Sequence, residues 1–120
     1  MVEHKCLISV IVFSRHGEDI LKKLYELLMD RKKNPVSGSY TTYLFEKGID
    51  KILKKVGEES AEFIIGAKNG DRTEVVGEAS DLIYHVLLTL ADMDIDIEEI
   101  YEELREREGK RHEKEYKTEK

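Results

Sequence analysis

The stretch from Lys55 to His85, KVGEESAEFIIGAKNGDRTEVVGEASDLIYH, carries two pairs of acidic residues on either side of a turn signal, Asn-Gly-Asp. Within each pair the two residues are three positions apart, a spacing that places them on one face of an α-helix. The pairs are centred at equal distances from Gly70, so two antiparallel helices that reverse there would bring all four carboxylates to one level. The four residues are Glu59, Glu62, Glu78 and Asp81.

Four carboxylates at one level repel one another strongly unless positive charge lies among them. Acidic residues on a helix are usually only a solvated face, but these two pairs flank apolar stripes instead of lying opposite them. We therefore predict a cation site. Its all-oxygen ligands suit Mg²⁺, with Mn²⁺ as the alternative, and the sequence lacks the cysteine and histidine clusters that zinc prefers.

The composition predicts a single domain over residues 1–120. Hydrophobic residues make up 40% of the chain, enough for an ordinary core. Charged residues make up 38%, with one proline and eight glycines, and this favours an all-α fold over a sandwich or barrel. The net charge of -6 argues against a nucleic-acid-binding surface, which needs a basic face.

Residues 1–16 form an extension whose structure the pattern leaves open. Its β-branched segment 7–13 could pair as a strand with the same segment of a second subunit, or form an irregular start to the first helix. The apolar run is too short to cross a bilayer, and no signal-peptide cleavage motif follows it. The single cysteine, Cys6, excludes an intrachain disulfide and is expected to be a buried small hydrophobe. We predict a cytoplasmic protein without a membrane partner.

Apolar periodicity predicts four helices with short connections, as in a helical bundle. The third of these is apolar on more than one side, and a monomer of this size has little interior to cover both. We therefore predict a homodimer, with higher assembly left open. The expected helices cover 19–34, 42–69 with a bend at Gly48, 72–93, and a segment from Ile97 that leads into a charged tail at 110–120.

Other residues near the acidic pairs have both a structural and a functional interpretation. Glu58 is either a surface charge or a group that orients water. Lys55 is either the partner of Glu59 in an i, i+4 ion pair or a phosphate contact. The segment Ser39-Tyr40-Thr41 is either a helix cap and turn or a substrate contact. His85 is as often a satisfied interface histidine as a ligand, so we do not assign it to the metal.

Several motifs together resemble one family. The pattern of the acidic residues, with Glu58 before the first pair, resembles the MazG-like all-α nucleoside triphosphate pyrophosphohydrolases. The flanking motifs narrow the resemblance to the phosphoribosyl-ATP pyrophosphohydrolases of the histidine pathway, over about residues 20–109. These motifs are Gly38-Ser39-Tyr40-Thr41, Leu44-Phe45, Lys47-Gly48, Lys54-Lys55-Val56-Gly57-Glu58-Glu59 and Asp81-Leu82-Ile83-Tyr84-His85.

The resemblance implies a fold, a reaction and a set of site residues. It implies an oligomeric all-α enzyme that uses Mg²⁺ to hydrolyse phosphoribosyl-ATP to phosphoribosyl-AMP and pyrophosphate, the second step of histidine biosynthesis. A housecleaning enzyme that acts on other nucleoside triphosphates is the alternative, and a non-catalytic helical dimerisation module is the third possibility. The resemblance assigns Glu59, Glu62, Glu78 and Asp81 to the metal, with Glu58 beside them. Our own inference adds Glu58 as the catalytic acceptor of the water proton, with a metal-bound carboxylate as the alternative. It also adds contacts to the substrate from Ser39, Tyr40, Thr41, Lys47, Lys51 and Lys55.

Overall fold

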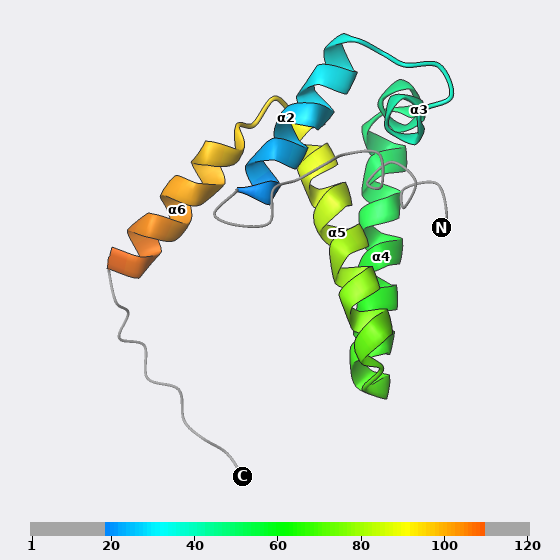
Figure 1. The fold of residues 1–120 in the computed structure, drawn as a ribbon, viewed down its shortest axis with the longest axis vertical. Coiled ribbons are helices and arrows are strands. Elements are labelled where there is room, and N and C mark those ends of the chain that lie inside the picture. Colours follow the sequence, from blue (N-terminus) through cyan, green and yellow to red (C-terminus); the bar gives the residue numbers. More distant parts are fainter. Residues whose placement is uncertain (1–18, 110–120) are drawn as a thin grey trace.

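The computed structural model describes residues 19–109, and within them every regular element is an α-helix (Figure 1). The predicted all-α class is confirmed. The predicted extension at 1–16, Cys6 and the tail at 110–120 lie outside the described residues. The helices are α2 (Ile20–Lys33), α3 (Tyr40–Lys47), α4 (Ile49–Asn69), α5 (Arg72–Asp92) and α6 (Ile97–Gly109).

Five helices are described instead of the predicted four, because the chain breaks at Gly48 where we expected only a bend. Gly48 has φ 97° and ψ 179°, a conformation that side chains other than glycine rarely adopt. Its amide donates to Leu44 O at 3.0 Å and so ends α3, while its carbonyl accepts from Lys51 and Ile52 in the first turn of α4. The break lets α3 cross α4 instead of continuing it (Figure 1).

The predicted reversal at Gly70 is confirmed, and α4 and α5 form a long antiparallel hairpin (Figure 1). Gly70 is left-handed, with φ 70°, and amides at 70 and 71 bond back to carbonyls at 67 and 66, which closes the end of α4. Asp71 then caps α5 by accepting from the Glu74 amide at 3.2 Å. The absence of a side chain at Gly66 lets Glu74 pack against α4, since a Cβ there would lie 3.2 Å from its Cγ.

The hydrophobic core lies where α2 and α3 pack against the end of the hairpin far from Gly70. Each large apolar side chain buried there contributes roughly 1.5–3 kcal/mol to stability. This core fixes the end of the hairpin far from Gly70, and the acidic residues lie next to it, near the middle of α4 and α5. Its fully buried apolar members are Leu28, Leu44, Ile52, Tyr84, Leu88 and Ala91.

The apolar stripe predicted on α4 lies mostly outside this core. Ile52 is buried, but Leu53 is 48% exposed and Ile64 is 63% exposed. Helix α4 instead buries Lys55, beside α3, and Glu59, beside α5. Within the described residues, therefore, α4 buries charged groups and leaves apolar side chains exposed.

Helix α6 continues to Gly109, so its charged residues 105–109 are helical. Its start is held by the buried Ile97, by a bond from the Tyr101 hydroxyl to Asp19 at 2.8 Å, and by an ion pair from Lys22 to Glu98 at 3.1 Å. Among the helices at 19–109, none is both long and apolar enough to cross a membrane. A cytoplasmic location stays a prediction.

Lys32 on α2 stabilises the C-terminal end of α5. Its Nζ donates to Ala91 O at 2.9 Å, to Asp92 O at 3.1 Å and to Asp94 Oδ1 at 2.9 Å. We expect Lys32→Met to lower the free energy of unfolding by about 1–3 kcal/mol, because two helix-end carbonyls lose a charged donor. Urea titration measures this, with Lys33→Met, exposed and on the same helix turn, as the control; equal stability of the two variants would contradict the role.

Candidate metal centre

Three of the four acidic residues predicted to meet do form a tight group. Glu59 on α4 and Glu78 and Asp81 on α5 each offer an oxygen atom, and these atoms lie within 4.8 Å of one another. Glu59 and Asp81 are buried and Glu78 is half-buried. Glu62 is more exposed and lies outside this group, but its carboxylate is within hydrogen-bonding reach of Glu78. The hairpin geometry expected from the spacing therefore brings the acidic side chains together.

Two carboxylate oxygens of this cluster have no hydrogen-bond donor within the described residues. Glu59 Oε1 and Glu78 Oε1 are buried without a partner, and a buried polar atom in that state costs about 1–3 kcal/mol. Burial raises the pKa of Glu78 to about 7. The neighbouring Glu59 and Glu62 add to the rise, because they accept a hydrogen bond from the protonated carboxyl group and repel its charged form. Such a cluster needs a proton or a cation, and its oxygen donors fit a hard divalent cation.

Lys55 supplies positive charge at the edge of the cluster. Its side chain is buried, and Nζ lies 3.5 Å from Glu59 Oε2 and 3.3 Å from Glu58 Oε1. The i, i+4 pair expected from the sequence is therefore present, but it is buried at both ends and not a surface pair. Glu58 itself is exposed at the rim.

A pocket of about 210 Å³ lies between α3 and α4 beside the cluster. Lys55 belongs to both, since it lines the pocket and pairs with Glu59. Two aromatic rings form part of the wall, Tyr40 and Tyr43, whose centroids are 6.4 Å apart and whose planes are 27° apart. The lining residues are Tyr40, Tyr43, Leu44, Lys51, Lys55 and Glu58.

The other predicted substrate residues have different surroundings. Ser39 caps α3 by accepting from the Thr42 amide at 3.2 Å and also accepts from Arg31 at 3.1 Å. Thr41 is buried and bonded to the hydroxyl of Tyr84. Lys47 is exposed and lies over the Tyr43 ring, 5.8 Å from its centroid. Of the predicted set, Tyr40, Lys51 and Lys55 share the pocket, while Ser39, Thr41 and Lys47 lie outside its lining.

The sequence did not reveal that His85 bonds to Tyr40 of α3. The imidazole is fully buried, with Nδ1 2.7 Å from the Asp81 carbonyl oxygen and Nε2 3.0 Å from the Tyr40 hydroxyl. Tyr43 and Leu44 were also missed as pocket residues. The sequence places His85 one helical turn after Asp81, which predicts that the two are close but does not predict a partner on α3.

Comparison with known proteins identifies the family. Residues 21–108 match the family described as phosphoribosyl-ATP pyrophosphohydrolase, a range that includes nearly all of the five helices. The chain belongs to the phosphoribosyl-ATP pyrophosphohydrolase family. The resemblance inferred from the motifs is confirmed.

Relatives with similar sequences are either close to the length of this chain or about twice as long. The phosphoribosyl-ATP pyrophosphatase of Bacillus mycoides is 55% identical over 93 residues, which are 78% of this chain and 87% of that protein. The same enzyme of Clostridium acetobutylicum is 53% identical over 77% of this chain and 84% of its own. The histidine biosynthesis bifunctional protein HisIE of Thermoanaerobacter pseudethanolicus is 56% identical over 77% of this chain, and the match spans only 43% of that longer protein.

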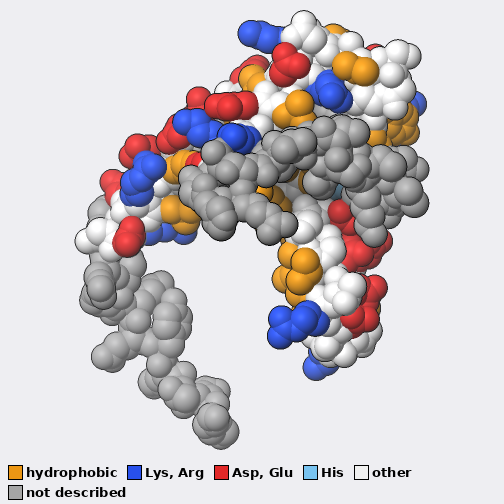
Figure 2. All heavy atoms as spheres, in the orientation of Figure 1, with side chains coloured by type: hydrophobic (Ala, Val, Ile, Leu, Met, Phe, Trp, Pro, Cys, Tyr) orange, Lys and Arg blue, Asp and Glu red, His pale blue; other side chains and the backbone are white. Residues whose placement is uncertain are grey.

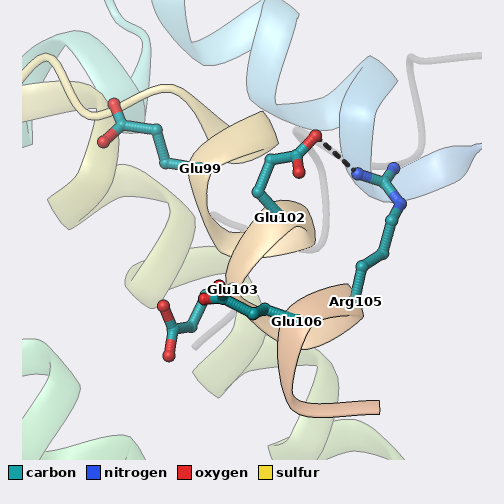
Figure 3. Close-up of a pocket in the computed structure, with 5 residues that line it drawn as sticks. All are labelled: Glu99, Glu102, Glu103, Arg105 and Glu106. Carbon is teal, nitrogen blue, oxygen red and sulfur yellow. Dashed lines mark hydrogen bonds and ion pairs between the residues drawn. The ribbon is translucent and has the colours of Figure 1, made fainter. Parts of the chain in front are cut away.

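A second depression, on α6, differs from the pocket beside the acidic cluster in its lining and its exposure. Its lining residues all come from one helix, and two of its carboxylates already pair with arginines of that helix, Glu102 with Arg105 (Figure 3) and Glu103 with Arg107, each at 3.0 Å. All of them are exposed, so water solvates these charges. We interpret it as a solvated acidic face. The lining residues are Glu99, Glu102, Glu103, Arg105 and Glu106.

Proposed function

We propose that this protein hydrolyses phosphoribosyl-ATP to phosphoribosyl-AMP and pyrophosphate, the second step of L-histidine biosynthesis. The observation that carries the proposal is the cluster of Glu59, Glu78 and Asp81, with two buried oxygens that lack a donor, beside a pocket sized for part of a nucleotide. Relatives named phosphoribosyl-ATP pyrophosphatase, matched over more than four fifths of their length, support the choice of substrate.

In this proposal Mg²⁺ is the cofactor, with Mn²⁺ as a substitute, and Glu59, Glu62, Glu78 and Asp81 hold it. When bound, the ion neutralises phosphate charge and polarises the phosphoryl group under attack. Glu62 lies beside Glu78, outside the group of three and closer to solvent. This position suits a fourth ligand on the exposed side of the metal.

The side chains around the cluster would handle the water and the substrate. Glu58 accepts the proton of the attacking water, and Lys55 orients Glu58 by binding its Oε1 at 3.3 Å. The water oxygen forms a bond to phosphorus, the α,β-anhydride bond breaks, and pyrophosphate leaves with the bonding electrons. Tyr40, Lys51 and Lys55 contact the nucleotide in the pocket, and Lys47 attracts phosphate from its rim. Ser39 and Thr41 act by holding α3 in place.

The test is a substrate panel. Purified protein with Mg²⁺ is given phosphoribosyl-ATP beside dUTP, dCTP and ATP, and released pyrophosphate is measured. We expect the highest kcat/KM for phosphoribosyl-ATP and no release in EDTA. Faster turnover of a deoxynucleotide would support the housecleaning function instead, and no release from any nucleotide would support a non-catalytic dimerisation module.

We also propose that the protein is a homodimer, held by the apolar surface of the hairpin. Besides Ile64 on α4, α5 exposes Val76 by 61% and also Ile83 and Val86 at helical spacing. Figure 2 shows hydrophobic side chains on one edge of the hairpin and acidic side chains on the other. Exposed apolar surface on both helices of one hairpin is the usual mark of a subunit interface.

We expect Ile64→Glu to weaken dimerisation at least about 10-fold, because a charge would be buried against the partner subunit. Sedimentation or light scattering across a dilution series measures the change. Leu104→Glu is the control, since Leu104 is similarly exposed but lies on α6. A dimer constant that is unchanged in the Ile64 variant would place the interface elsewhere.

A further inference from the structure

We propose that His85 is a positioning residue for substrate binding: it fixes the ring of Tyr40 in the pocket wall and ties that ring to the backbone of the metal-site helix at Asp81. The inference rests on the proposed function of the cluster and pocket. It assigns His85 a purpose other than metal ligation or simple packing, through contacts that link α3 to α5.

The first step is the anchoring of His85 itself. A carbonyl oxygen can only accept a hydrogen bond, so Nδ1, at 2.7 Å from Asp81 O, carries a proton. The Tyr84 ring packs against the imidazole with centroids 4.9 Å apart and planes at 90°. The Thr89 hydroxyl bonds the carbonyl of His85 at 2.9 Å. With no exposed surface, the imidazole has one available orientation.

The second step is the effect on Tyr40. Since Nδ1 holds the proton, Nε2 of the neutral ring is an acceptor, and the Tyr40 hydroxyl donates to it over 3.0 Å. Tyr40 is the second residue of the segment Ser39-Tyr40-Thr41 and is only half-buried, so its ring reaches the pocket while its hydroxyl points into the protein. The hydroxyl proton is therefore used within the protein, and Tyr40 meets the substrate with its ring.

The third step concerns what the pocket can hold. Its volume of about 210 Å³ is below the roughly 300 Å³ at which complete small-molecule sites begin, so it takes only a part of the nucleotide. A wall for part of a ligand contributes to affinity when its orientation is set before binding, because no side-chain freedom is then lost. His85 supplies that orientation, so its removal should weaken binding more than it slows the chemical step.

The experiment compares kcat and KM for phosphoribosyl-ATP in Tyr40→Phe, His85→Asn and the double variant. Asparagine retains a donor for the Asp81 carbonyl but has no atom at the position of Nε2. We expect each single variant to raise KM about 10-fold with kcat within about twofold, the pattern of lost ground-state and transition-state binding. The KM of the double variant should be no higher than that of the single variant with the higher KM, because both substitutions remove the same Tyr40–His85 contact. His85→Gln, with an amide near the position of Nε2, should recover part of the affinity.

Tyr25→Phe is the matched control. It also removes a tyrosine hydroxyl that makes a hydrogen bond, to Ile95 O at 2.6 Å, and neither residue lines the pocket. The variant should therefore lower the melting temperature without changing KM. Unchanged KM in Tyr40→Phe and His85→Asn, or additive effects in the double variant, would overturn the role of His85. If His85→Asn does not fold, the KM of Tyr40→Phe decides. If the wild-type protein hydrolyses no nucleotide, the proposed function itself is wrong. The wild-type assay therefore tests the function, and the variants test only the role of His85.

Discussion

Replacing Glu78 by glutamine should remove most of the activity and yet make the metal-free protein more stable. Activity should fall about 10²–10³-fold, the usual cost of losing one group that stabilises transition-state charge. Stability should rise at pH 8 because the charge removed lies half-buried among Glu59, Glu62 and Asp81. Few substitutions outside a binding site combine these two effects, so the pair of outcomes is specific to a cation site.

The dependence on pH follows from the pKa of Glu78. In the folded protein it is about 7, raised from an ordinary value of 4.5 by burial and by Glu59 and Glu62. The folded state therefore binds this proton more tightly than the unfolded state does. The resulting stability is fully present below pH 4.5 and is lost as the pH rises through 7.

Urea titration in EDTA at pH 5 and pH 8 measures this loss. The wild-type protein should be less stable at pH 8, Mg²⁺ should restore the stability, and Glu78→Gln should reduce both the loss and the restoration. Glu26→Gln, an exposed glutamate on α2, is the control and should behave as wild type. If Mg²⁺ stabilises the Glu78 variant as much as the wild type, the residue does not hold the metal.

Replacing Lys55 by methionine should have the opposite effect on stability. Lys55 is buried against Glu59, which is only 1% exposed, so the variant leaves a buried carboxylate without its cation. We expect the free energy of unfolding to fall by about 3 kcal/mol at pH 8 without metal. This is the lower end of the cost of breaking a buried ion pair, because Glu58, the other partner of Lys55, remains exposed to water. Activity should also fall, since Glu58 is no longer oriented.

Lys54→Met is the matched control for this variant, because Lys54 is the neighbouring lysine on α4 but is exposed. Urea titration with and without Mg²⁺ and the kcat/KM for phosphoribosyl-ATP are the measurements. Mg²⁺ should recover part of the stability of the Lys55 variant by supplying charge to Glu59. Equal stability of the two variants would mean that the buried pair contributes nothing to the fold.

The hairpin and its acidic residues could be predicted from the sequence because both depend on local properties. Helical periodicity sets which residues share a face, and Gly70 sets where the chain reverses. These two facts bring Glu59 level with Glu78 and Asp81 without knowledge of any other contact. The all-α class followed in the same way from composition and apolar spacing.

The burial of α4 could not be predicted, since periodicity finds an apolar stripe but does not say what covers it. The buried side of α4 holds Lys55 and Glu59, and Ile64 is left exposed. Packing of a charged face is tolerated here because the lysine pairs with the glutamate.

The sequence by itself therefore determined the helices, the turn at Gly70 and the meeting of the acidic pairs, all of which are consequences of backbone geometry over short distances. The tertiary structure decided the pocket. Because Gly48 has a positive φ, α3 leaves the line of α4 and places Tyr40 beside His85 of α5, a residue 45 positions away. Contacts across such separations depend on how helices cross, which spacing along one chain does not specify.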